Sequence, residues 1–275
     1  MSKTFKIAAL LAVFAMMACV EDVDPGKLGL NEKLIVVNSL ISPQSDVLEV
    51  EVSWSRSVFG LQPDYGSNED IITSAKVVIS NGNNSVTLPY VQEEYLYKLQ
   101  ASQFPILTGQ TYGLEVTVGN ETVTASTTVP QPVSASGFSI TSGSNNAQRA
   151  TVSWEDLPGQ ENFYRINTFL LNASGEEQAS IFFDTDEYHS DANRDGATIT
   201  ARGETYFFGN VPNFVEAKAL LISCDENYYL YHKDYNVFQN DDPFSEAVQS
   251  RSNIEGGVGI FAAYQLTETI VNTGG

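Results

Sequence analysis

The chain has 275 residues, with 34 Asp or Glu against 14 Lys or Arg, so its formal net charge is −20. Basic residues are too scarce to follow a phosphate backbone, which argues against nucleic acid as a partner. Hydrophobic residues make up 42% and charged residues 17%, a balance too apolar for a disordered chain. Two Cys and two His exclude cysteine-rich zinc modules, iron–sulfur clusters and disulfide-stapled scaffolds.

Residues 1–18 have the pattern of a bacterial lipoprotein signal peptide. Lys3 and Lys6 precede an apolar run over 7–18, which is too short to span a bilayer as a helix. The run ends in Met-Met-Ala directly before Cys19, as in a relaxed lipobox. We expect cleavage before Cys19 and attachment of lipid, including palmitate, to this residue. The alternative is an ordinary signal peptide in which Cys19 is incidental.

Residues 19–32 are expected to form an acidic tether, since they are polar and contain Pro and Gly. Glu21, Asp22 and Asp24 resemble the export signal that sends Bacteroidota lipoproteins to the outer face of the outer membrane. The alternative is a solvated acidic linker without a signal. No later segment approaches 18 uninterrupted apolar residues, so we expect the lipid on Cys19 to be the membrane contact.

Residues 33–130 predict an antiparallel β-sandwich. Over 48–54, apolar residues alternate with Glu and Ser, so one face of the strand is apolar and the other polar, which is typical of antiparallel sheets. Two-residue turns are expected at Asn81-Gly82 and Gly119-Asn120. Further strands are expected over 34–37, 75–80, 86–88, 95–99, 112–118 and 123–129, with a loop over 60–70. This density of short strands is typical of an immunoglobulin-like sandwich.

A domain boundary is expected at 130–132, because Pro-Gln-Pro cannot continue a central strand. Residues 133–270 then predict a second sandwich. The run Val152-Ser153-Trp154, followed by Pro158-Gly159 and 164–166, resembles a fibronectin type III domain, where a buried Trp packs against the opposite sheet. Strands are expected over 137–141, 150–154, 163–172, 179–183, 197–201, 205–208 and 215–223.

One short helix is expected near the C-terminus, over 225–239, where aromatic residues recur at helical spacing. Ser223 and Glu226 match a capping box at its start. In the strand that follows, Gly256, Gly257 and Gly259 predict a bulge or a close approach of backbones. The expected fold is all-β, with two immunoglobulin- or fibronectin-like antiparallel sandwiches and this helix.

Three segments carry a resemblance to a known family. The first consists of Cys19, the acidic residues that follow it and residues 34–41. The second is the end of a hairpin, residues 124–130, before Pro132. The third is residues 242–264, which contain the sequence Ser-Asn-Ile-Glu-Gly-Gly-Val-Gly-Ile-Phe. The chain resembles a Bacteroidota family of outer-membrane lipoproteins, the domain of unknown function four-two-four-nine (DUF4249). That family is similar in context to lipoproteins encoded beside TonB-dependent receptors, which implies a transporter as partner. The resemblance implies no catalytic residues.

A metal site is suggested by Asp191, Asn193 and Asp195, which match the first half of a calcium loop together with Gly196. An EF-hand also needs a bidentate Glu at loop position 12, where this chain has Arg202. The alternative, an Asp/Asn/Gly hairpin turn, is therefore our expectation. Nearby carboxylates that could complete a shell are Asp184, Asp186 and Glu187.

Other candidate groups favour structural roles. The acidic pairs are expected on a solvated surface: Glu155-Asp156, Glu176-Glu177, Asp225-Glu226 and Asp241-Asp242. His189 and His232 lack metal-ligand spacing, and no nucleophile elbow or phosphate loop is present. Residues expected in a core are Trp54, Trp154, Cys224 and the tyrosines 228, 229 and 231, which could alternatively stack on a sugar.

From these features we expect a surface-exposed outer-membrane lipoprotein, a non-catalytic accessory subunit of a TonB-dependent nutrient uptake system. One alternative is a cell-surface adhesion or scaffold protein. The other is a carbohydrate-binding or carbohydrate-active protein. No cofactor is expected, with calcium at the Asp191 loop as the alternative.

Overall fold

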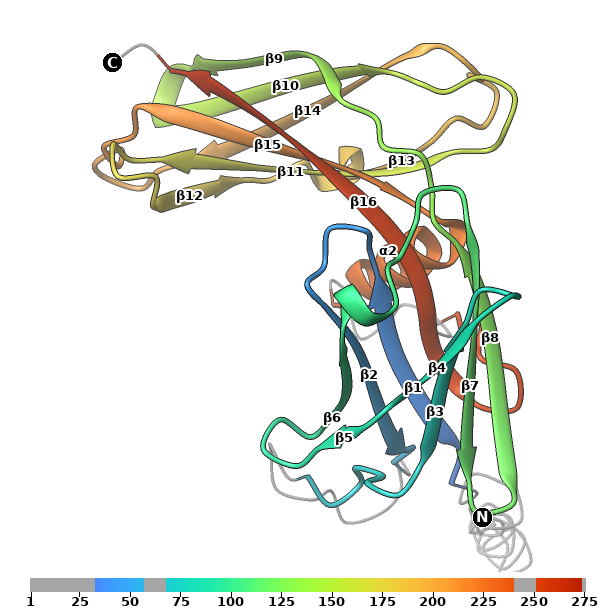
Figure 1. Ribbon diagram of the computed structural model, residues 1–275. Coiled ribbons are helices and arrows are strands. Elements are labelled where there is room, and N and C mark those ends of the chain that lie inside the picture. Colours follow the sequence, from blue (N-terminus) through green and yellow to red (C-terminus); the bar gives the residue numbers. More distant parts are fainter. Residues whose placement is uncertain (1–32, 57–67, 240–250, 274–275) are drawn as a thin grey trace, which may run out of the picture. The chain divides into compact units, whose positions relative to one another are not determined.

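The computed structural model describes residues 33–56, 68–239 and 251–273 (Figure 1). Almost all of them belong to one compact unit, Leu34–Ser55 with Gly66–Gly275, and all elements below lie in it. No helix in these ranges is long and apolar enough to cross a membrane. The expected loop over 60–70 lies largely outside the described residues, as do the signal peptide and the tether.

The first sandwich is built from two sheets. Its strands are β1 (Ile35–Ile41), β2 (Val47–Trp54), β3 (Lys76–Ser80), β4 (Ser85–Leu88), β5 (Tyr90–Val91), β6 (Leu96–Gln100), β7 (Thr111–Val118) and β8 (Glu121–Thr128). One sheet has the order β4-β3-β7-β8, and the other contains β1-β2-β6-β5. Alternate residues of these strands, such as Val37, Val50 and Tyr112, are fully buried between the sheets. The period-two pattern therefore places one apolar row per strand in a single core.

The second sandwich follows the same plan. Its strands are β9 (Ala135–Ser142), β10 (Ala147–Glu155), β11 (Phe163–Leu171), β12 (Glu177–Ile181), β13 (Tyr188–Ser190), β14 (Thr198–Tyr206) and β15 (Glu216–Cys224). The sheet β14-β10-β9 faces β12-β11-β15 across a core centred on Trp154, as the fibronectin-like pattern predicts. Burying an aromatic side chain of this size contributes about 3 kcal/mol. The structure thus confirms the all-β fold with two sandwiches.

The last strand, β16 (Val258–Asn272), joins sheets of both sandwiches. Its first part pairs with β1 in parallel, from Val36↔Val258 to Ile41↔Ala263, and its second part pairs antiparallel with β15. Figure 1 shows it in dark red, running from β1 to β15. Within the described residues it completes a nine-stranded sheet. The expectation of purely antiparallel sheets is therefore wrong at β1, and β16 is not confined to the second sandwich.

Glycines permit this parallel pairing. Gly259 has φ +119, and a Cβ there would lie 2.1 Å from the carbonyl oxygen of Val37. A Cβ on Gly257 would lie 2.5 Å from the carbonyl oxygen of Ile35. The side chain of Asn253 bonds both the amide and the carbonyl of Phe261, at 2.9 and 2.7 Å. The glycine-rich segment expected to pack closely does so, and its role is to seat β16 against β1.

Helix α2 (Glu226–Gln239) confirms the expected helix within about one residue. Its cap differs from the expectation, because Asp225 rather than Ser223 accepts from the amide of Tyr228, at 2.9 Å. The hydroxyl of Ser223 accepts from the amide of Val133 instead. Tyr228 and Tyr229 are buried and pack on Phe163, Ile222, Cys224, Ile260 and Ala262. The helix therefore covers the face of β11, β15 and β16 that is turned away from the two sandwich cores.

Two local expectations are wrong. The Asn81-Gly82 turn is a four-residue loop, since the amide of Asn81 donates to the carbonyl of Asn84 at 3.0 Å. Where two strands were expected, over 197–201 and 205–208, the structure has one continuous strand, β14 (Thr198–Tyr206). Its register with β10 is unbroken from Ala147↔Tyr206 to Glu155↔Thr198, so Gly203 pairs with Ala150 and does not interrupt the strand.

Candidate binding cleft

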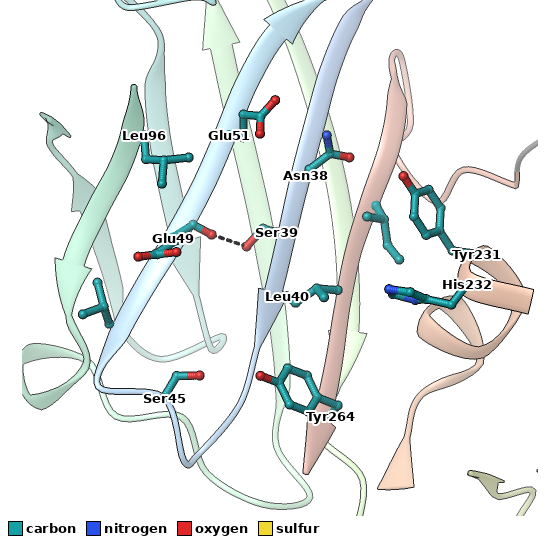
Figure 2. A pocket seen from close by; sticks show the side chains of 12 residues that line it. Asn38, Ser39, Leu40, Ser45, Glu49, Glu51, Leu96, Tyr231, His232 and Tyr264 are labelled. Carbon is teal, nitrogen blue, oxygen red and sulfur yellow. Dashed lines mark hydrogen bonds between the residues drawn. The ribbon is translucent and has the colours of Figure 1, made fainter. Parts of the chain in front are cut away.

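A cleft of about 530 Å³ lies on the outer face of the first sandwich, beside helix α2 (Figure 2). Strands β1, β2, β6 and β16 form its floor, and two side chains of α2 form a wall. The lining residues are Asn38, Ser39, Leu40, Ser45, Val47, Glu49, Glu51, Leu96, Tyr231, His232, Ile260 and Tyr264. The size is that of a small-molecule site.

Strand register brings the floor together. Asn38 of β1 is paired with Glu51 of β2 on one side and with Ile260 of β16 on the other. Since residues two apart share a face, Leu40 lies beside Asn38 on the outer face of β1, and it is 37% exposed. The floor therefore combines apolar side chains with the carboxylates of Glu49 and Glu51 and the amide of Asn38.

The wall is aromatic. His232 stacks on Tyr228 with ring centroids 4.1 Å apart, and Tyr264 lies 5.7 Å from Tyr228. Nδ1 of His232 lies 2.9 Å from the carbonyl oxygen of Tyr228 and must donate, because a carbonyl only accepts. Burial lowers the pKa of His232, so the ring is neutral at neutral pH and its Nε2 is an acceptor. Figure 2 shows His232 and Tyr231 projecting from α2 toward the strands.

The charges on the cleft side of the sheet are mostly acidic. Lys98 lies 2.7 Å from Glu49 and also pairs with Glu94, and these hydrogen bonds raise its pKa. The cation is thereby neutralised by two carboxylates. Glu51 makes no ion pair or hydrogen bond with any described residue. The cleft can accept hydrogen bonds and offers little positive charge to an anion.

A second cluster, of three carboxylates, lies at the end of β10. Ligand atoms of Asp156, Asp191 and Asp195 lie within 4.8 Å of one another, the first two residues being buried. The structure brings together Asp191 and Asp195, which the sequence grouped, and Asn193 between them has a positive φ of 65. Asp156 was expected on the surface and is 4% exposed, because Tyr164 donates to its Oδ1 at 2.6 Å.

Each of these carboxylates already accepts a hydrogen bond. The amide of Gly196 donates to Asp156 at 2.8 Å, and the amide of Gly159 donates to Asp195 at 2.7 Å. Asn162 donates to Asp191 at 3.5 Å. The cluster thus ties the loop 191–197 to the end of β10, as a hairpin-turn role requires.

The other candidates fall as follows. Cys19, Glu21, Asp22 and Asp24 lie outside the described residues. Cys224 is a buried free thiol whose pKa is raised by burial, as expected of a packing residue. His189 is buried against Trp154, with ring centroids 5.2 Å apart. Asp225, expected on a solvated surface, is a partly buried helix cap. Trp154 and Tyr228 are core residues, whereas Tyr231 lines the cleft.

The sequence did not predict the cleft. Asn38 and Glu51 are ordinary outward residues of alternating strands, and only the pairing of β1 with both β2 and β16 brings them beside α2. The available signal was a polar residue, Asn38, within the apolar run 34–41.

These features define an all-β protein of two sandwiches with a cleft under its helix. The family model for a domain of unknown function, DUF4249, matches residues 21–270, and the chain belongs to this family. A search of curated proteins finds no match.

Two solved structures are similar to this chain. One is a two-domain fibronectin type III segment of chicken tenascin, with 14% identity, a TM-score of 0.23 and coverage of 88% of this chain and 100% of that one. The other, FN1–FN3 of chicken CNTN1, has 13% identity and a TM-score of 0.27, covering 87% of this chain and 69% of that one. The strand order and register of the sheets themselves define the fold.

Proposed function

We propose that this protein is a lipid-anchored accessory protein of the outer-membrane surface that serves a TonB-dependent nutrient uptake system by binding rather than catalysis. The observation that carries the proposal is the N-terminal sequence, in which Cys19 follows a short apolar run and precedes Glu21, Asp22 and Asp24. The resemblance to lipoproteins encoded beside TonB-dependent receptors is the reason for proposing a transporter as the partner. Membership of DUF4249 is consistent with that resemblance. The cleft beside α2 supplies a place for a ligand.

The anchor is tested by one substitution. Cys19→Ser should abolish palmitate labelling and release the protein from membranes, since a single thiol carries the lipid. Replacing Glu21, Asp22 and Asp24 with Ala should leave labelling intact and reduce cleavage by protease added to whole cells. A Cys19→Ser protein that still takes up palmitate overturns the anchor.

The partner is tested by affinity purification of the tagged wild-type protein from solubilised outer membranes. A TonB-dependent receptor recovered in near-equal amount supports the proposal. Recovery of the protein without a receptor contradicts it and favours the adhesion or scaffold role. Cleavage of members of a polysaccharide panel would instead favour a carbohydrate-active protein.

A further inference from the structure

The cleft floor contains an acceptor pair without an assigned role. Glu51 and Asn38 are directly paired across β2 and β1, and both side chains are only partly exposed. Neither makes a side-chain hydrogen bond or ion pair with a described residue. Holding a carboxylate in a partly desolvated position without a partner costs free energy that a bound donor would recover.

The charges around this pair favour a positively charged ligand over a negatively charged one. Lys98 is already paired with Glu49 and Glu94, so these three side chains together with Glu51 carry two net negative charges. His232 is neutral and offers Nε2 as an acceptor. An anion would meet repulsion here, whereas a cation that donates N–H groups would meet acceptors.

The apolar and aromatic residues of the cleft favour a ligand that also carries an aliphatic chain. Leu40 and Ile260 border the pair on the floor, and Tyr231 stands at the wall (Figure 2). Apolar surface of this kind covers an aliphatic chain, and an aromatic face attracts a cation that approaches it.

We propose that the cleft binds an organic cation, an ammonium or guanidinium group on an aliphatic chain, with Glu51 and Asn38 as the recognising pair. The group is either a free small molecule or the Lys or Arg side chain of a partner protein. This inference uses neither the lipid anchor nor the receptor, so it can fail or succeed independently of the proposed function.

The test is calorimetric titration of the full-length protein in detergent with agmatine, which carries guanidinium and ammonium groups on a four-carbon chain. Saturable binding is expected, weakening as salt is raised because the attraction is between charges. Glu51→Gln should weaken binding at least tenfold. Glu115→Gln, which removes an exposed carboxylate from β7 outside the cleft, should leave binding unchanged. Equal melting temperatures show that both variants fold.

Two further titrations distinguish a free small molecule from the Lys or Arg side chain of a partner protein. Binding of agmatine assigns a small-molecule site, while binding of an Arg- and Lys-rich peptide without agmatine assigns a partner's side chain. Asn38→Asp, which adds a second carboxylate beside Glu51, should tighten binding of whichever cation binds. Failure of both probes to bind, or an equal loss in Glu51→Gln and Glu115→Gln, overturns the proposal, as does preferential binding of a neutral oligosaccharide.

Discussion

At the scale of single residues, specific donors hold the buried carboxylates of Asp156 and Asp225 in place. Asp225 is the clearest case, since its carboxylate accepts from the amide of Tyr228 at 2.9 Å, from Thr127 at 2.5 Å and from Asn227 at 3.2 Å. The bond to Thr127 ties the start of α2 to the end of β8. Asp225 therefore acts as a cap and as a link between elements far apart in sequence.

Stability should depend on the ionisation of Asp225. Burial raises the pKa of this carboxyl above its ordinary 3.8. A raised folded-state pKa means that its contribution is complete below 3.8 and is lost as pH rises through the higher folded value. Relative to Asp225→Asn, the wild type should therefore lose free energy of unfolding over that rise. Denaturant titrations at several pH values measure this difference.

Two variants control that experiment. Glu226→Gln, at the exposed neighbouring position, keeps Asp225 and should therefore retain the wild-type loss of stability over that rise. Asp225→Ala should cost about 2 kcal/mol at neutral pH, because the cap and the partner of Thr127 are both lost. A pH-independent difference between the wild type and Asp225→Asn would contradict the role of burial.

Calcium should not bind measurably at Asp156, Asp191 and Asp195. Tyr164, Asn162 and two backbone amides already donate hydrogen bonds to their carboxylates. Melting curves in millimolar calcium and in chelator should coincide. A calcium-dependent rise of several degrees that Asp195→Ala abolishes and Glu176→Ala does not would reinstate the metal site, since binding at a hundredfold excess over Kd adds about 2.7 kcal/mol.

Sequence reasoning at this scale succeeded where the signal was local and failed where it was not. Asp191 and Asp195 are four residues apart in one loop and were grouped correctly. Asp156 joins them only through the pairing of β10 with β14, and adjacency to Glu155 gave no hint of burial. Ser223 fitted the capping box by spacing, but its hydroxyl is used by Val133.

At the scale of elements, β16 determines how the sheets are connected. Alternation predicted most strands because each has one buried face and one exposed face. The parallel pairing of β1 with β16 was not predictable in this way, because it joins residues more than 200 positions apart. Gly257 and Gly259 did predict a close approach of two backbones, and they lie where β16 meets the carbonyl groups of β1.

Gly259→Ala should disrupt this pairing. A Cβ at Gly259 would lie 2.1 Å from a backbone oxygen that cannot move without breaking the ladder. We expect a loss of about 3 kcal/mol or more in the free energy of unfolding. Gly209→Ala is the matched control, since its φ of +117 is nearly the same and nothing lies within 4 Å of the added atom. Equal losses in the two variants would show that φ alone matters.

At the scale of the whole molecule, the expected domain boundary at 130–132 remains a prediction, and the structure adds how this segment is held. Val129 and Val133 are buried. Gln265 of β16 donates to the carbonyl of Pro130 at 2.5 Å, and Thr267 donates to the carbonyl of Val133 at 2.7 Å. The amide of Val133 donates to Ser223 at 3.1 Å. A segment bonded in this way resists the local unfolding that a protease requires.

Limited digestion with thermolysin should therefore leave the bonds between 129 and 134 intact in the native protein. The double variant Gln265→Ala with Thr267→Val removes two side-chain donors that hold the segment, and it should become cleavable before Val133. Thr269→Val, on the same strand and without a side-chain hydrogen bond to this segment, should behave like the wild type. The new N-termini are read by sequencing the fragments. Cleavage of the wild type in this window, at the rate of the double variant, would show that the segment opens freely and that the two sandwiches are separated by a simple linker.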